Sequence, residues 1–187
     1  MVLPAGPLQL PAGAATSLQC GAASVPAARL AWRGPGNSSW VGPRLYFSSL
    51  AHTDTGQYTC RATNSQGSAV SDPVLLTVTG PPTIQPASTE EGIATTVMPG
   101  EAAVLSVRYC GWPAPSLVWR AGRVTLWGGA RHGRLSSSRP SPRPAHPGCY
   151  TATLHIHQAR LQDTGSYNVR GATEYRYFIY FLKCIIT

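Results

Sequence analysis

Two seven-residue stretches decide the fold of this chain: Asp54–Cys60, with the sequence DTGQYTC, and Asp163–Val169, with the sequence DTGSYNV. Each begins with an Asp-Thr-Gly turn signal and runs into a segment with a Tyr two positions before its last residue. The second stretch differs at that last residue, where Val169 replaces a cysteine. This recurrence predicts two copies of one module within the 187 residues.

The spacing upstream of these stretches repeats as well. Trp32 lies twelve positions after Cys20, and Trp119 lies twelve positions after Val107. Apolar residues then recur in the same order, at Leu45, Phe47 and Leu50 in the first copy and at Leu154, Ile156 and Ala159 in the second. The whole frame is therefore duplicated, and valine stands at both cysteine positions of the second copy.

A cysteine, a Trp twelve residues later and a D-T-G-x-Y-x-C stretch together resemble the immunoglobulin (Ig) domain. The resemblance implies an all-β fold made of two tandem Ig-like antiparallel β-sandwiches. Only 22 residues separate Trp32 from Asp54, which is too few for a variable-type domain and favours the I-set or C2-like type. We expect the first domain over residues 1–79 and the second over residues 80–187.

The resemblance also assigns structural roles. It implies a buried indole on strand C, a tyrosine corner before strand F, an Asp in the same turn, and two valines that face each other across the second core. The residues concerned are Trp32, Tyr58 and Asp54 in the first copy, and Trp119, Tyr167, Asp163, Val107 and Val169 in the second.

The five cysteines indicate an oxidising compartment, and their odd number leaves at least one without a partner in the chain. In the Ig frame, Cys20 and Cys60 lie on opposite sheets with both sulfurs in the core, so we expect a disulfide. Closing this loop should stabilise the fold by roughly 3–4 kcal/mol. The alternative is two free buried thiols, as in intracellular Ig domains.

Cys110 and Cys149 require a separate account. The frame places Cys110 at the end of strand B and Cys149 at the start of strand E, both facing outward on antiparallel neighbours. We predict a Cys110–Cys149 disulfide within one sheet. The alternatives are that both are free or that one of them pairs with Cys184.

The formal net charge is +8, from 14 Arg and one Lys against seven acidic residues. No Asp or Glu lies between Ala102 and Gln162, where eight Arg occur. Five of these arginines lie in the Pro-rich segment 121–148, which we predict to be a long exposed loop between strands C′ and E. The guanidinium groups of this segment, together with the guanidinium group of Arg120, can bind sulfate or carboxylate groups of a ligand. The alternative is that the segment is a disordered insert without a ligand. The candidate polyanion-binding residues are Arg120, Arg123, Arg131, Arg134, Arg139 and Arg143.

Asn37 begins the triplet Asn37-Ser38-Ser39, an N-glycosylation signal in a predicted exposed turn. No catalytic, cofactor-binding or metal-binding motif stands out, so we expect a chain that is not an enzyme and has no cofactor. The apolar run at residues 177–186 is shorter than the ~20 residues of a membrane-spanning helix and is interrupted by Lys183. The sequence leaves open whether residues 177–187 form strand G of the second domain.

Tandem Ig domains imply a recognition or adhesion module of the cell surface that binds a protein partner, such as another Ig domain, and no nucleic acid. We expect an extracellular or cell-surface location for this piece of a longer membrane or secreted protein. One alternative is a secreted or matrix protein that binds heparan sulfate through the Arg-rich segment. The other is an intracellular Ig pair of the sarcomere type.

Overall fold

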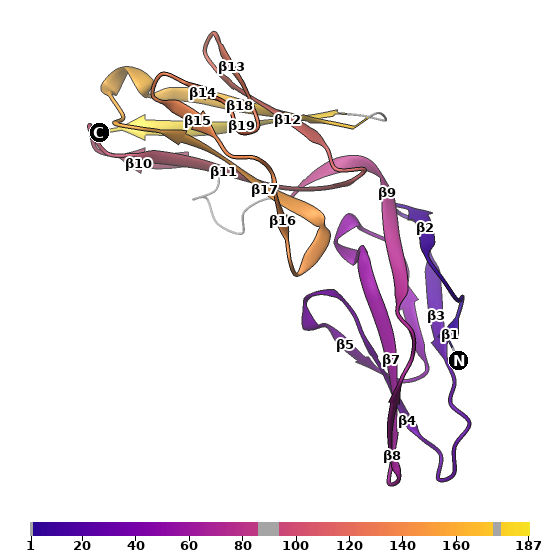
Figure 1. Ribbon diagram of the computed structural model, residues 1–187. Coiled ribbons are helices and arrows are strands. Elements are labelled where there is room, and N and C mark those ends of the chain that lie inside the picture. Colours follow the sequence, from indigo (N-terminus) through magenta and orange to yellow (C-terminus); the bar gives the residue numbers. More distant parts are fainter. Residues whose placement is uncertain (1, 86–93, 174–176) are drawn as a thin grey trace. The chain divides into compact units, whose positions relative to one another are not determined.

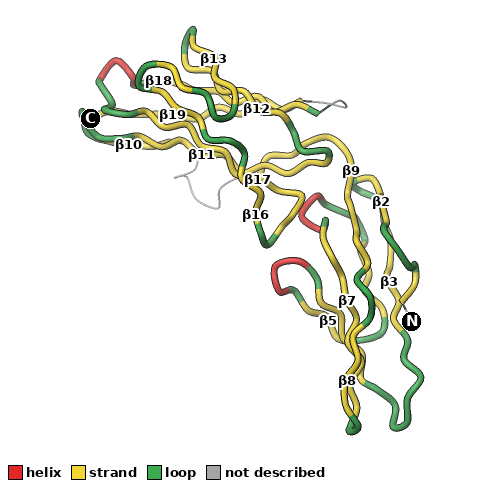
Figure 2. The backbone as a smooth tube through the Cα atoms, in the orientation of Figure 1, coloured by secondary structure: helices red, strands yellow, loops and turns green. Residues whose placement is uncertain are grey.

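The computed structural model describes residues 2–85, 94–173 and 177–187. Strands dominate its regular structure, and the described helical segments are single 3-10 turns (Figures 1 and 2). This confirms the all-β prediction. The chain divides into two compact units, the first comprising Met1–Gly80 and Pro144–Gly148, and the second comprising Pro81–Arg143 and Cys149–Thr187. The division falls one residue after the boundary that the sequence predicts, and it adds five residues of the Arg-rich segment to the first unit.

The first unit contains two sheets whose strand pairs are antiparallel, except that β2 and β9 pair in parallel. Its elements are β1 (Val2–Leu3), β2 (Leu8–Pro11), β3 (Thr16–Cys20), β4 (Arg29–Arg33), the 3-10 turn Pro35–Asn37, β5 (Ser39–Val41), β6 (Arg44–Phe47), the 3-10 turn His52–Asp54, β7 (Gly56–Asn64), β8 (Gly67–Val70) and β9 (Val74–Gln85), whose last residues belong to the second unit. One sheet has the order β1-β3-β6. In the other, β7 pairs with β4 on one side and with β8 and β9 on the other, and β5 pairs with β4.

The second unit also contains two sheets. Its elements are β10 (Ala94–Val97), β11 (Ala103–Trp112), β12 (Ser116–Ala121), β13 (Val124–Trp127), β14 (Arg131–His132), β15 (Leu135–Ser137), β16 (Ser141–Arg143), β17 (His146–Ile156), the 3-10 turn Leu161–Asp163, β18 (Gly165–Ala172) and β19 (Tyr177–Ile186). One sheet has the order β10-β19-β18-β12-β13, and the other contains β14-β15-β17-β11. The C-terminal run therefore forms strand G, antiparallel to β18 and parallel to β10.

The core of the first unit is built around Trp32, which has no exposed surface. Trp32 lies directly opposite Cys60 on the neighbouring strand β7. Cys60 is joined to Cys20 with an S–S distance of 2.00 Å and a Cα–Cα distance of 6.3 Å. The indole Nε1 donates a hydrogen bond to the Pro43 carbonyl at 3.3 Å. The ring is therefore fixed by packing, by the adjacent disulfide and by one polar contact.

The core of the second unit keeps the indole and replaces the disulfide with aliphatic volume. Trp119 is fully buried and lies opposite Val169, which is also fully buried. Val107 is 3% exposed and belongs to the same apolar cluster. Both valines thus occupy the core where the resemblance places them, and apolar burial alone holds the two sheets together at this point.

Both units contain the tyrosine corner. The Tyr58 hydroxyl donates to the Asp54 carbonyl at 2.8 Å, and the Tyr167 hydroxyl donates to the Asp163 carbonyl at 2.7 Å. Burial, assisted by the nearby Cys184 and Asp163, raises the pKa of Tyr167 to about 12, and burial likewise raises the pKa of Tyr58. Both phenols therefore stay protonated and act as donors across the physiological pH range.

Cys110 and Cys149 are direct partners in the register of β11 and β17, and they form the second disulfide. Both alternate with Tyr109 and Tyr150, which pack on the apolar core, so they lie on the outward side of their strands as expected, yet neither has exposed surface. Cys184 is a free thiol on β19 with no exposed surface.

The segment 121–148 is not a long loop, which corrects the sequence-based prediction. It forms β13, β14, β15, β16 and the first residues of β17. Leu126 is 2% exposed in the core, and the Ser137 hydroxyl donates to the Trp127 carbonyl at 2.5 Å. Because β15 pairs with β17, the segment supplies an additional strand to the sheet that contains the second disulfide.

These pairings predict the result of a peptide map of the non-reduced protein. We expect one fragment linking Cys20 to Cys60 and one linking Cys110 to Cys149, with Cys184 alkylated only after unfolding because it is buried. The loops span 40 and 39 residues, so breaking either bridge should cost about 4 kcal/mol on the chain-entropy estimate. A fragment with Cys184 in a disulfide would contradict this assignment.

Candidate interaction surface

The outward side of the β13-β12-β18-β19 sheet presents an unusual surface, named here the second-unit face. Inward and outward residues alternate along each strand, so burying Trp119 and Val169 turns their neighbours outward. The register places Trp127, Val118, Arg170 and Ile179 in one cross-strand row, and Thr125, Arg120, Asn168 and Phe181 in the next.

Three large apolar side chains of this face are exposed to solvent. Trp127 is 61% exposed, Phe181 is 63% exposed and Ile179 is 50% exposed. Trp127 lies on the edge strand β13, and the other two lie on β19, so they flank the middle of the sheet. Covering a large apolar side chain contributes roughly 1–2 kcal/mol, so this face gains substantially from a partner.

The polar groups between these side chains are mostly cationic. Arg120 and Arg170 project from the two central strands, and Lys183 follows on β19. The five strands of the sheet contain no Asp or Glu. The second-unit face is therefore apolar and basic. Acidic groups of a binding partner would lie close to its apolar side chains, where water and salt screen a charge pair less than in bulk water.

The six arginines that the sequence groups as a polyanion site lie on different elements of the second unit. Arg120 belongs to the second-unit face, and Arg134 is held in an ion pair. Arg123 lies in the turn before β13, Arg131 lies on β14 and Arg143 lies on β16, while Arg139 precedes β16. The six thus lie on strands and on the turns between them, and their joint binding of a polyanion stays a prediction.

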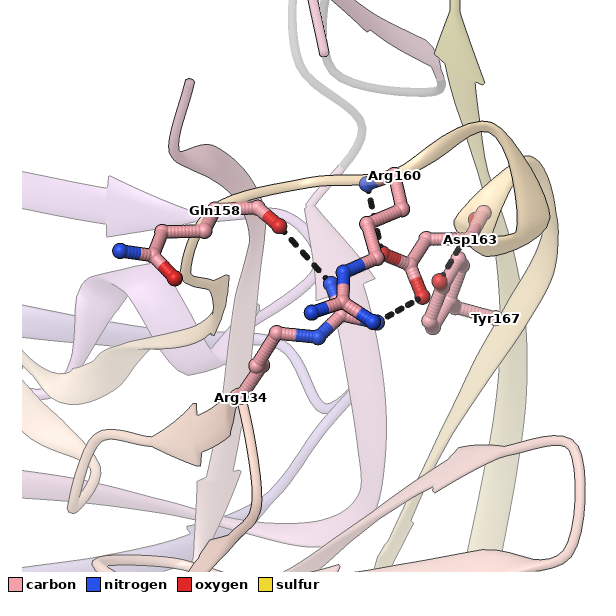
Figure 3. A network of polar contacts seen from close by, with 5 residues as sticks. All are labelled: Arg134, Gln158, Arg160, Asp163 and Tyr167. Carbon is pink, nitrogen blue, oxygen red and sulfur yellow. Dashed lines mark hydrogen bonds and ion pairs between the residues drawn. The ribbon is translucent and has the colours of Figure 1, made fainter. Parts of the chain in front are cut away.

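Arg134, in the turn between β14 and β15, forms an ion pair with Asp163 of the 3-10 turn Leu161–Asp163 (Figure 3). Its two terminal nitrogens donate to the two carboxylate oxygens at 2.5 and 2.9 Å, and one also donates to the Gln158 carbonyl at 2.9 Å. The carboxylate in turn accepts the Arg160 backbone N–H at 2.8 Å. The Arg134 hydrogen bond is the main reason that the pKa of Asp163 lies below its usual range.

This ion pair predicts an acid-sensitive contribution to stability. Because the pKa of Asp163 is lower in the folded state, its contribution is complete above about pH 4, the usual unfolded value, and is lost as the pH falls through the folded pKa. Arg134→Gln should therefore flatten the pH dependence of unfolding below about pH 4, measured by urea denaturation from acid to neutral pH. Arg139→Gln, which removes an exposed Arg of the same segment, is the control. An unchanged pH dependence in the Arg134 variant would refute the linkage.

Asn37 ends the 3-10 turn Pro35–Asn37 with a left-handed φ of 63° and is exposed. Ser39, whose hydroxyl completes the glycosylation triplet, is also exposed at the start of β5. The site is thus accessible, and its modification remains a prediction.

Sequence reasoning missed the second-unit face. The sequence feature that could have indicated this face is the C-terminal run at residues 177–182, because a strand with this sequence has apolar side chains on both sides. The structure assigns Leu182 to the core and Phe181 to the exposed side.

The described residues contain no group of three or more His, Cys, Asp or Glu side chains placed to hold a metal ion. Within the same parts of the chain, no helix has the length and apolar character needed to cross a bilayer.

Comparisons with known proteins agree with this architecture. The family model described as an immunoglobulin domain matches residues 1–78. Mouse hemicentin-2 is 33% identical over 169 residues, a match that covers 77% of this chain and 3% of hemicentin-2. The chain thus spans only a small fraction of this relative.

Solved structures show the same fold over nearly the whole chain. The titin Ig tandem A164-A165 superimposes with a TM-score of 0.66 at 18% identity, covering 97% of this chain and 93% of that two-domain chain. A chain from the crystal structure of Dpr2 Ig1-Ig2 in complex with DIP-Theta Ig1-Ig3 gives a TM-score of 0.64 at 17% identity, covering 100% of this chain and 64% of that one. This chain belongs to the immunoglobulin superfamily and is a tandem of two Ig-like domains.

Proposed function

We propose that the chain is a recognition or adhesion module of the cell surface, and that it binds a protein partner through the second-unit face. The observation that carries this proposal is the set of exposed apolar side chains Trp127, Ile179 and Phe181, with arginines between them on the same side of one sheet. Trp and Arg are the residue types enriched among the side chains that dominate binding energy at protein interfaces.

The composition of the face defines the chemistry of its partner. A matching surface would be flat enough to lie on a sheet, apolar opposite Phe181 and Ile179, and acidic opposite Arg120. Burying a cation under an apolar partner without a counter-charge would cost several kcal/mol, so an acidic group opposite Arg120 is a requirement of the match. The outer sheet of another Ig domain has a suitable shape, and the neighbour from the Dpr2 complex comes from an assembly of Ig chains.

An extracellular location is part of the proposal. Two disulfides, Cys20–Cys60 and Cys110–Cys149, are stable in an oxidising environment and rare in the cytosol. The exposed triplet at Asn37 suits a chain that passes through the secretory pathway. A catalytic role has no support from the Ig domain match.

Binding to an array of purified ectodomains tests the proposal. The chain, presented as a multimer, should capture at least one ectodomain, and Phe181→Asp should weaken this capture by about 10-fold or more, because it places a carboxylate in the apolar part of the face. Phe181 is 63% exposed, so the variant should fold normally.

Leu161→Asp provides the matched control, since Leu161 is 66% exposed on the 3-10 turn Leu161–Asp163, away from the sheet face. It should bind like the unaltered chain. Equal capture by the Phe181 variant, or no captured ectodomain at all, would argue against this function.

A further inference from the structure

A second surface, on the other domain, has a different chemistry. The outward side of β4 and β7, named here the first-unit face, carries three exposed arginines: Arg29, Arg33 and Arg61. They are three of the four Arg in the first unit's residues 1–80, and that stretch has no Lys. Their common orientation follows from burial of Trp32 and Cys60, which alternate with them along the two strands.

The register of the strands sets the spacing of these arginines. Arg29 and Arg33 are four residues apart on β4, which corresponds to about 13 Å along a strand. Arg61 on β7 pairs with Ala31, the residue midway between them. The three side chains therefore rise from the corners of a triangle, on backbone that the sheet holds rigid, with the small Ala31 at the centre of its long side.

No carboxylate neutralises this triangle in the described structure. The first unit has two acidic residues over positions 1–80. Asp54 lies in the turn before β7, where its side chain accepts the Ala51 backbone N–H at 2.8 Å. Asp72 lies in the connection between β8 and β9. The single ion pair found among the described residues is that of the second unit.

Hydroxyl groups surround the arginines. Thr59 and Ser39 lie opposite Arg33 on either side, and Thr63 lies opposite Arg29. Ser68 accepts a hydrogen bond from Arg61 Nη2 at 3.0 Å. These hydroxyls can donate to sulfate oxygens, so the face offers several neutral donors in addition to its positive charge.

The first-unit face lacks the side chains that favour a protein partner. Its outward positions include Val41 and Val70, but none on β4, β5, β7 and β8 is aromatic. Without a large apolar anchor, binding relies on charge and hydrogen bonds. That balance suits a flexible polyanion with repeated fixed charges.

We propose that the first-unit face binds a sulfated polysaccharide, with Arg29, Arg33 and Arg61 each contacting a sulfate group and the surrounding hydroxyls completing the contacts. Guanidinium groups match the planar arrangement of sulfate oxygens through paired hydrogen bonds. The site shares no residue with the Arg-rich segment 121–148 or with the second-unit face, and it stands whether or not the chain binds a protein partner.

Surface plasmon resonance on immobilised heparin tests this site in the complete chain. The triple variant Arg29→Gln, Arg33→Gln and Arg61→Gln should weaken binding by about 10-fold or more and reduce its dependence on salt. The matched control is Arg123→Gln, Arg131→Gln and Arg139→Gln, which removes the same charge from exposed positions of the second domain. It should retain nearly full binding. Thermal unfolding of both variants checks that they remain folded.

Competition experiments with soluble probes identify the class of ligand. Heparin should compete, whereas hyaluronan, which carries carboxylates without sulfates, should not. Equal losses in the two triple variants would show binding to overall charge and would overturn the site. Competition by polyglutamate as strong as that by heparin would overturn the sulfated polysaccharide and favour an acidic protein.

Discussion

Each domain depends on the packing of one indole ring against the residue that faces it on the neighbouring strand. In the first domain Trp32 meets Cys60 and its disulfide, and in the second Trp119 meets Val169. The contact also sets the orientation of both strands, because side chains alternate between the two sides of a sheet. Burying the indole therefore determines which neighbours reach solvent, and the two proposed binding faces are consequences of core packing.

The second domain keeps this packing without a disulfide across its sheets, and it contains other constraints that the first domain lacks. Cys110 and Cys149 are linked within one sheet, β15 extends that sheet, and Arg134 holds the carboxylate of the tyrosine-corner turn. In the first domain the corresponding Asp54 accepts a backbone N–H but forms no ion pair with another described residue. A covalent link between sheets is thus replaced by a link within one sheet and a link between two turns.

The sequence predicted the frame because a few side chains with strict spacing define it. The steps from Cys20 to Trp32 and from Asp54 to Cys60 correspond to strand and turn lengths that the Ig fold fixes, and both recur in the second copy. The segment 121–148 was misjudged because its strands are two to four residues long and are interrupted by Gly and Pro, so no periodicity emerges. The candidate faces were harder still, since they arise from residues on separate strands that only the register brings together.

The most direct test of this account is the environment of Trp119 in solution. Nuclear Overhauser spectra of the intact chain should show contacts from the Trp119 indole to the methyl groups of Val169 and Val107, because all three are buried in one apolar cluster. Aqueous quenchers should leave the fluorescence of Trp119 largely unaffected, since the ring has no exposed surface. Absence of these contacts, together with ready quenching of Trp119, would contradict the central claim that both domains are built on the same buried indole.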